Sequence, residues 1–92
     1  MGKYVPFGEL NNRISDAFYK NASVVGTMQG LQETKGGGWT VLLLEKKLYA
    51  CATFSSIGYS CAEEIDASEL HMYVDNVESA KEKLSDLGGH NE

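Results

Sequence analysis

The sequence predicts a single small α+β domain, with a four-stranded, mainly antiparallel sheet and two amphipathic helices on one face of that sheet. Its 92 residues, 42% hydrophobic and 23% charged, have the size and composition of one globular domain. The centre of the chain, 39–57, holds two β-rich runs on either side of a polar turn at 45–47. A helical pattern lies on each side of this hairpin. The predicted order of elements is α-β-β-β-α-β-α.

The first helix is predicted over 8–20, where apolar residues such as Leu10, Ile14 and Phe18 recur at intervals of four. Asn21 is suited to end this helix in a left-handed conformation. Residues 22–33 then alternate with a period of two, which predicts a strand. Gly26 and Gly30 weaken this strand and indicate a bulge, or the close approach of another backbone or a ligand.

The two central strands differ in their patterns. The run 39–44 is apolar on both faces towards its end, which is typical of a strand covered on both sides. In the run 48–55, the small residues Ala50 and Ala52 leave room for a helix to pack closely. Gly36, Gly37 and Gly38 precede the first of these strands and predict a hairpin turn.

The C-terminal third is predicted to hold a short helix, a fourth strand and a last helix. Ser60 and Glu63 have the spacing of a capping box, which predicts a helix over 61–67. Residues 70–74 alternate in polarity and predict the fourth strand. Asp75 and Glu78 form a second capping box before a helix that Gly88 would close. Residues 89–92 are predicted to be a frayed tail of the domain 1–92.

One short stretch resembles a known family. The segment 71–89, HMYVDNVESAKEKLSDLGG, is similar to the opening strand and helix of a vicinal-oxygen-chelate (glyoxalase-like) module. A member of that family would need three further strands and additional metal ligands after this segment. We therefore treat the similarity as a general strand–helix pattern and assign no family from it.

The charge of the chain excludes several classes of partner. The net charge is −5 and Arg13 is the single arginine, so the chain lacks the basic surface that binds nucleic acid or an anionic membrane. No run reaches the ~18–20 apolar residues of a membrane span, and the first residues do not resemble a secretory signal. We expect a cytoplasmic protein whose two cysteines are reduced.

Metal binding and catalysis are less favoured by the sequence than binding. His71 lies near four acidic residues, Glu63, Glu64, Asp66 and Glu69, but no spacing matches a known metal signature. Cys51 or Cys61 with His71 as a base would be the best catalytic set, although buried packing is the commoner role of cysteine. We predict no catalytic residue, metal or cofactor, and keep an enzyme as the third alternative.

The first functional hypothesis concerns an uncovered face of the sheet. With both long helices on one face, no helix is left to cover the other. We predict that this chain is a small non-catalytic regulatory protein, an adaptor or inhibitor. It would bind a protein partner or a second copy of itself through this face. The predicted interface residues are Trp39, Tyr49, Cys51, Thr53 and Tyr73.

The alternative is a protein that binds or sequesters a small, nucleotide-like molecule. Residues 55–60 are predicted to run from a strand into a helix N-terminus with several hydroxyl groups, which suits an anion. The glycine-bearing strand would complete the site. The predicted ligand-binding residues are Ser55, Ser56, Tyr59, Ser60, Gly26 and Gly30.

Overall fold

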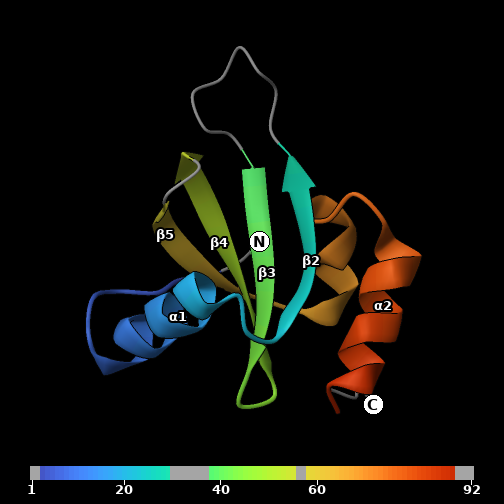
Figure 1. Cartoon of the computed structure of the whole chain (residues 1–92), viewed down its shortest axis with the longest axis horizontal. Helices are drawn as coiled ribbons and strands as arrows, with labels where there is room; N and C mark the ends of the chain where they lie inside the picture. Colours follow the sequence, from blue (N-terminus) through green and yellow to red (C-terminus); the bar gives the residue numbers. More distant parts are fainter. Residues whose placement is uncertain (1–2, 30–37, 56–57, 89–92) are drawn as a thin grey trace.

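Four strands connected in chain order form an antiparallel sheet that carries helices on both of its faces (Figure 1). The computed structural model describes residues 3–29, 38–55 and 58–88. The sheet order is β1-β5-β4-β3-β2, and all pairs are antiparallel. The predicted class, one α+β domain with a four-stranded antiparallel sheet, is confirmed. A two-residue strand, β1 (Lys3–Tyr4), adds a short fifth strand at the β5 edge.

The N-terminal helix, α1 (Glu9–Lys20), agrees closely with the prediction. Its two buried side chains, Ile14 and Ala17, lie on one stripe of the helix because they are three residues apart. Asn21 ends the helix with φ 55° and ψ 40°, the predicted left-handed conformation. Phe7 does not join the stripe, since 87% of its surface is exposed.

The glycine-bearing strand, β2 (Val24–Gln29), contains the predicted bulge, which lies between Val24 and Gly26. A Cβ atom at Gly26 would lie 2.8 Å from Cγ1 of Val74 and 3.3 Å from Cβ of Ala80. The close approach inferred from this glycine is therefore real. It is made by the C-terminal helical layer, which packs directly on the backbone of β2.

The central hairpin joins β3 (Gly38–Leu44) to β4 (Lys47–Ser55) through Glu45 and Lys46. These two turn residues have φ values of 53° and 69°. Positive φ at both central residues is the conformation of a type I′ turn, which matches the twist of the flanking strands. Neither residue is Gly or Asn, so this turn forms in spite of its local sequence.

The C-terminal third differs from the prediction at two elements. Residues 58–65 form a strand, β5 (Gly58–Ile65), instead of a capped helix, because β4 provides backbone partners along its length. The predicted fourth strand is a 3₁₀ helix, η1 (Ala67–Met72). At its start, the Asp66 N–H donates to the Glu69 carboxylate at 2.9 Å. The strand–helix resemblance over 71–89 therefore does not extend to the structure.

The last helix, α2 (Val77–Asp86), is present, but its cap lies one residue later than predicted. The Oδ1 atom of Asn76 accepts the N–H of Ser79 at 3.0 Å, so Asn76 caps the helix in place of Asp75. The buried residues of α2 are Ala80 and Leu84. No helix in the described part of the chain is long and apolar enough to cross a membrane.

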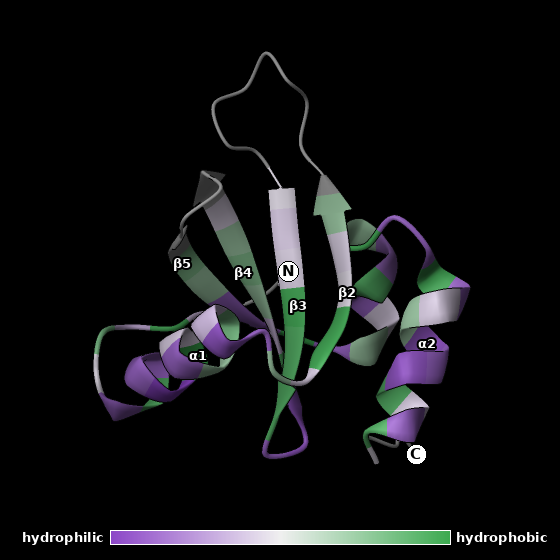
Figure 2. Ribbon diagram, in the orientation of Figure 1, coloured by the Kyte–Doolittle hydropathy of each residue, from purple (hydrophilic) through white to green (hydrophobic). Residues whose placement is uncertain are grey.

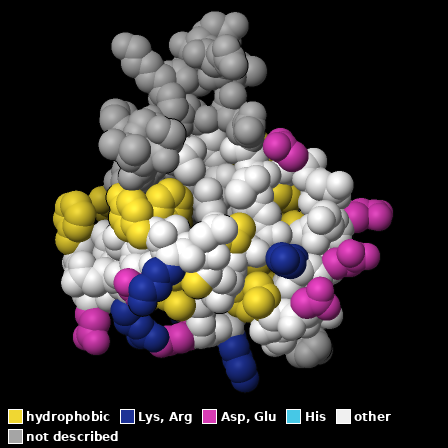
Figure 3. All heavy atoms as spheres, viewed as in Figure 1, with side chains coloured by type: hydrophobic (Ala, Val, Ile, Leu, Met, Phe, Trp, Pro, Cys, Tyr) yellow, Lys and Arg dark blue, Asp and Glu magenta, His cyan; other side chains and the backbone are white. Residues whose placement is uncertain are grey.

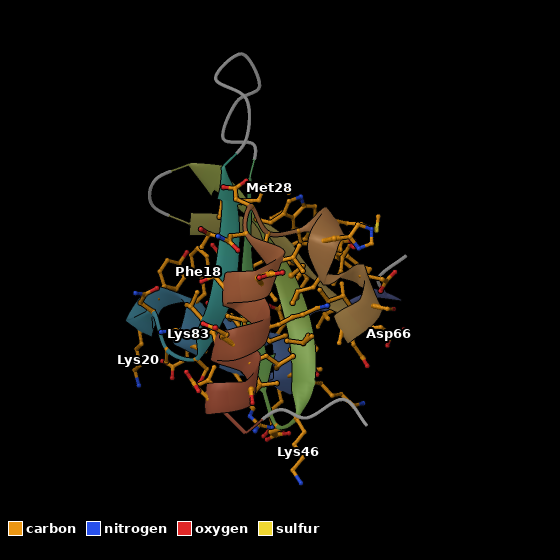
Figure 4. The ribbon with its side chains drawn as sticks, turned by 90° about the vertical axis from the view of Figure 1, so that its right-hand side faces the viewer. Phe18, Lys20, Met28, Lys46, Asp66 and Lys83 are labelled. Atoms are coloured by element: carbon orange, nitrogen blue, oxygen red, sulfur yellow. The ribbon has the colours of Figure 1, made fainter. Side chains whose placement is uncertain are left out.

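The two long helices lie on opposite faces of the sheet, and the prediction that they share a face is wrong. Two separate hydrophobic clusters show this arrangement. Ile14 and Ala17 of α1 pack with Leu42, while Ala80 and Leu84 of α2 pack with residues on the other side of the same strands. In Figure 4, Phe18 of α1 and Asp66, which precedes η1, lie on opposite sides of the sheet. The physical reason is β3, which is apolar on both faces and needs a cover on each.

The helices on the two faces, α1 on one and η1 with α2 on the other, contact the sheet mainly near the Glu45–Lys46 turn. Figure 2 shows β3 strongly hydrophobic towards this turn and paler towards its other end. Val41 and Leu42 are fully buried, whereas Trp39 and Thr40 are partly exposed. The sheet is therefore closed on both faces at one end and more open at the other.

Candidate functional site

The predicted uncovered face is covered where Tyr49 and Cys51 lie. Both residues belong to the cluster under α1, with exposed fractions of 3% and 0%. A partner therefore cannot contact them unless α1 moves away. Their inclusion in the predicted interface is wrong for this fold, because the prediction placed both helices on the opposite face. Thr53 lies beyond a register shift in β4 and is partly exposed, so its role stays a prediction.

Charged residues border the covered face around Tyr49. Arg13 of α1 forms an ion pair with Glu45, and Lys47 Nζ lies 3.7 Å from Glu64 Oε2. Burial raises the pKa of the Tyr49 hydroxyl, as does nearby Glu64, while Arg13 opposes this rise. The Arg13–Glu45 ion pair links α1 to the hairpin, and burial keeps the tyrosine protonated. These contacts resemble a structural border more than a binding site.

Cys51 lacks the properties of a nucleophile. Burial raises its pKa to about 12, and the proximity of Cys61 adds to this rise. Because the reactive form is the thiolate, a thiol with this pKa is inert at neutral pH. Cys61 is next to Ala62, which packs under α1, so strand alternation directs Cys61 to the opposite face from Cys51. Both cysteines are free, as expected.

His71 does not join a catalytic or metal-binding group in the described residues. It is exposed on η1, and its Nδ1 atom lies 3.1 Å from the carbonyl oxygen of Ser68. The sheet separates it from Cys51, which lies under α1. Within 3–29, 38–55 and 58–88, no three His, Cys, Asp or Glu side chains are grouped so that they could hold a metal ion.

The predicted anion site loses its main structural argument. Ser55, Tyr59 and Ser60 lie on strands of a β4–β5 hairpin, not on a connection from a strand to a helix N-terminus. No helix N-terminus therefore directs backbone N–H groups at these residues. Ser56 lies outside the described residues.

The glycines predicted to lie against a ligand do not form a ligand site in the described structure. Gly26 faces Val74 and Ala80, which occupy the space that a ligand at this position would need. Gly30, like the glycine-rich turn residues Gly36 and Gly37, lies outside the described residues. One strand, β3, stands between β2 and the β4–β5 hairpin that carries Ser55, Tyr59 and Ser60. The site predicted between those segments is therefore not formed by neighbouring strands.

The partly exposed part of the η1 face is built around Trp39. The strand register places Met28, Trp39, Ala52 and Cys61 in one row across all four main strands. All four are partly exposed. The next row ends at Glu63, which is also partly exposed, whereas Val41 and Ala50 in the same row are fully buried. We call these residues the Trp39 surface: Met28, Trp39, Ala52, Cys61 and Glu63.

Tyr73 connects the aromatic and acidic parts of the Trp39 surface. Its ring meets Trp39 edge to face, with the centroids 4.8 Å apart. Its hydroxyl donates a hydrogen bond to Glu63 Oε1 at 3.2 Å. Tyr73 is itself buried, at 6% exposure, and packs with the η1–α2 cluster. It therefore supports Trp39 and Glu63 from the core. The prediction that Tyr73 itself contacts a partner does not fit this burial.

This arrangement suits binding more than chemistry. An indole that is already supported by a second ring loses little freedom when it meets a partner. The carboxylate of Glu63 is held by one hydrogen bond through Oε1. The surface thus offers a rigid aromatic group and a carboxylate that both contact Tyr73.

Sequence reasoning missed Met28, Ala52, Cys61 and Glu63 as neighbours of Trp39. Trp39 was predicted as an interface residue, but it was grouped with residues of the opposite face. Alternation alone placed Met28, Trp39 and Ala52 on defined faces of their strands. The missing information was the strand status of 58–65, which brings Cys61 and Glu63 into the sheet.

Comparison with known proteins adds no relative. No protein-family model, no curated protein and no solved structure matches this chain. The function must therefore be argued from the residues alone.

Proposed function

We propose that this chain is a small non-catalytic binding protein of the cytoplasm, an adaptor or inhibitor, that recognises another protein through the Trp39 surface. The single observation that carries the proposal is the supported position of Trp39. It is partly exposed and packs edge to face against buried Tyr73, whose hydroxyl also holds the carboxylate of Glu63. Tryptophan is among the residue types enriched at the positions that contribute most to the binding energy of protein interfaces.

The inert thiol of Cys51 also supports binding over catalysis, because it removes the best nucleophile from the predicted set. A nucleotide-like ligand at 55–60 remains the weaker alternative. Its support was a helix N-terminus, and a strand stands there instead.

Self-association, which the sequence led us to expect, is less favoured through this surface. A two-fold contact centred near Glu63 would place this carboxylate close to its copy, and like charges oppose such a contact. A different protein is the better partner.

Site-specific photo-cross-linking tests the proposal. A photoreactive residue in place of Met28 lies beside Trp39 in the sheet, whereas the same residue in place of Tyr19 lies on α1, where 61% of the tyrosine is exposed. We expect cross-links to another protein from position 28 in cells, and few from position 19.

Two results would count against the proposal. Cross-links from position 19 alone would move the binding site to the α1 side. An absence of cross-links at position 28, with a folded protein, would remove the Trp39 surface as an interface.

A further inference from the structure

We infer that the segment of the partner that meets the Trp39 surface is positively charged, with a lysine or arginine side chain placed over Trp39 and beside Glu63. This inference rests on the proposed function and names the chemistry of the partner. Aromatic faces attract cations, and Trp does so most strongly. A neighbouring carboxylate adds a charge-assisted hydrogen bond to the same group.

The first argument is the position of Glu63 at the end of an otherwise closed row. Val41 and Ala50 in this row are fully buried, and Gly26 at its other end is covered by Val74 and Ala80. The carboxylate is therefore held at the border between the apolar core and the open row of Trp39. Among the described residues, the hydroxyl of Tyr73, an uncharged donor, makes a hydrogen bond to this carboxylate.

The second argument is the charge of the chain around this surface. Apart from Glu64, which faces α1, the segment from Glu63 to Glu78 carries five acidic residues and no Lys or Arg: Glu63, Asp66, Glu69, Asp75 and Glu78; Lys81 and Lys83 follow on α2. A hydrogen bond from the Asp66 N–H lowers the pKa of Glu69, which keeps it ionised. Figure 3 shows further acidic side chains along the right-hand edge, over α2.

The ion pairs of the opposite face sharpen this argument. Arg13 and Lys47 both lie on the α1 side, where they pair with Glu45 and Glu64. Glu64 thus already has a cation, while its chain neighbour Glu63 faces the other way and meets Tyr73. The long-range field on the η1 side favours a basic partner and disfavours an acidic one or a second copy.

The two glutamates provide a matched pair of variants for a test. We would titrate the folded protein with the uncharged-ended peptide acetyl-Gly-Arg-Gly-amide, and with the same peptide containing norleucine or glutamate in place of arginine. The readout is the NMR signal of the indole N–H, which is unambiguous because Trp39 is the only tryptophan. We expect the arginine peptide to shift this signal and the other two to have a smaller effect.

The variants then separate a site from general charge attraction. Glu63→Gln keeps an oxygen for the Tyr73 hydroxyl and removes the charge, so it should weaken the arginine peptide about two- to fivefold. Glu64→Gln removes the same charge from the next residue and should leave the affinity unchanged. Equal weakening by both variants would overturn the inference.

A neutral quencher separates failure of this inference from failure of the proposed function. Acrylamide should quench the fluorescence of Trp39 in the folded protein. If acrylamide quenches and no arginine-dependent shift occurs, the partner is not cationic, and the inference fails while the binding surface stands. If acrylamide does not quench, Trp39 is closed to any partner, and both fail.

Discussion

The two faces of this sheet carry similar kinds of residue, but they differ in how far two neighbouring rows are covered at β4 and β5. On the α1 face, one row is exposed at Thr27 and partly exposed at Thr40, but Cys51 of β4 and Ala62 of β5 are fully buried under the helix. On the η1 face, the neighbouring row of Met28, Trp39, Ala52 and Cys61 stays partly exposed along its whole length. A cysteine or an aromatic residue therefore becomes core or surface according to which layer covers it.

The largest expected effects test whether both covers are equal parts of the core. Ile14 of α1 is fully buried, and Leu70 of η1 is 1% exposed. We expect Ile14→Ala and Leu70→Ala each to lower the free energy of unfolding by about 2–5 kcal/mol, because each leaves a cavity. Urea denaturation measures this. A loss below about 1 kcal/mol for Ile14→Ala alone would mean that α1 is only loosely attached and that its face is not closed.

A second prediction uses the raised pKa values on the α1 face. The pKa of Cys51 is raised from 9.0 to about 12, and the pKa of Tyr49 is raised above its usual value of 10.0. Both groups hold their protons more tightly when folded. Their contribution is complete below pH 9 and is lost as the pH rises towards 12.

For Cys51 this loss amounts to at most about 4 kcal/mol. Chemical denaturation at several alkaline pH values should show the decrease, and Cys51→Ala should make it shallower. Cys61→Ala, on the open face, is the control: it removes only the smaller cause of the raised pKa of Cys51 and should change the slope less than Cys51→Ala does. An unchanged slope in Cys51→Ala would show that the thiol is not held in a dry core.

A third prediction concerns the contact between β2 and the C-terminal layer. A methyl group at Gly26 would meet Val74 and Ala80, so Gly26→Ala should lower the free energy of unfolding by about 1–3 kcal/mol. The next residue, Thr27, is exposed, and Thr27→Ala should change stability by no more than about 0.5 kcal/mol. Thermal unfolding of the two variants would compare them. A stable Gly26→Ala variant would indicate that α2 lies further from β2 than described here.

The smallest effect lies at the end of the sheet where both faces are closed. Lys46 has φ 69° in a type I′ turn, and glycine adopts this conformation without the steric cost of a side chain. We expect Lys46→Gly to raise the free energy of unfolding by about 0.5–1 kcal/mol. Lys47→Gly, in the adjoining strand, should lower it instead. If both substitutions destabilise equally, the turn is of another type.

Much of the fold could be predicted from local patterns, and the errors have physical causes. The α1 boundaries, the central hairpin and the bulge beside Gly26 followed from spacing and turn residues. The segment 61–67 was predicted as a helix from the Ser60–Glu63 spacing, but residues 58–65 pair with β4, and this pairing outweighed the local signal.

The candidate site followed the same pattern of success and failure. Trp39 and Tyr73 could be selected as aromatic residues, but their relation could not. Their contact depends on η1. The alternating polarity of 70–74 had predicted a strand there instead of a 3₁₀ helix. Because the prediction placed both helices on one face, it wrongly treated Tyr49 and Cys51 as exposed. Which face a helix covers depends on packing between distant segments, which no local spacing reports.

The most direct test of the difference between the two faces is the rate at which each cysteine is alkylated in the folded protein. Mass spectrometry of peptides after brief treatment with iodoacetamide would give both rates from one sample. The account predicts that Cys61, in the row of Trp39, is labelled first, and that Cys51 reacts only when the protein unfolds. Labelling of Cys51 as fast as Cys61 under native conditions would contradict it, because the α1 face would then be open as well.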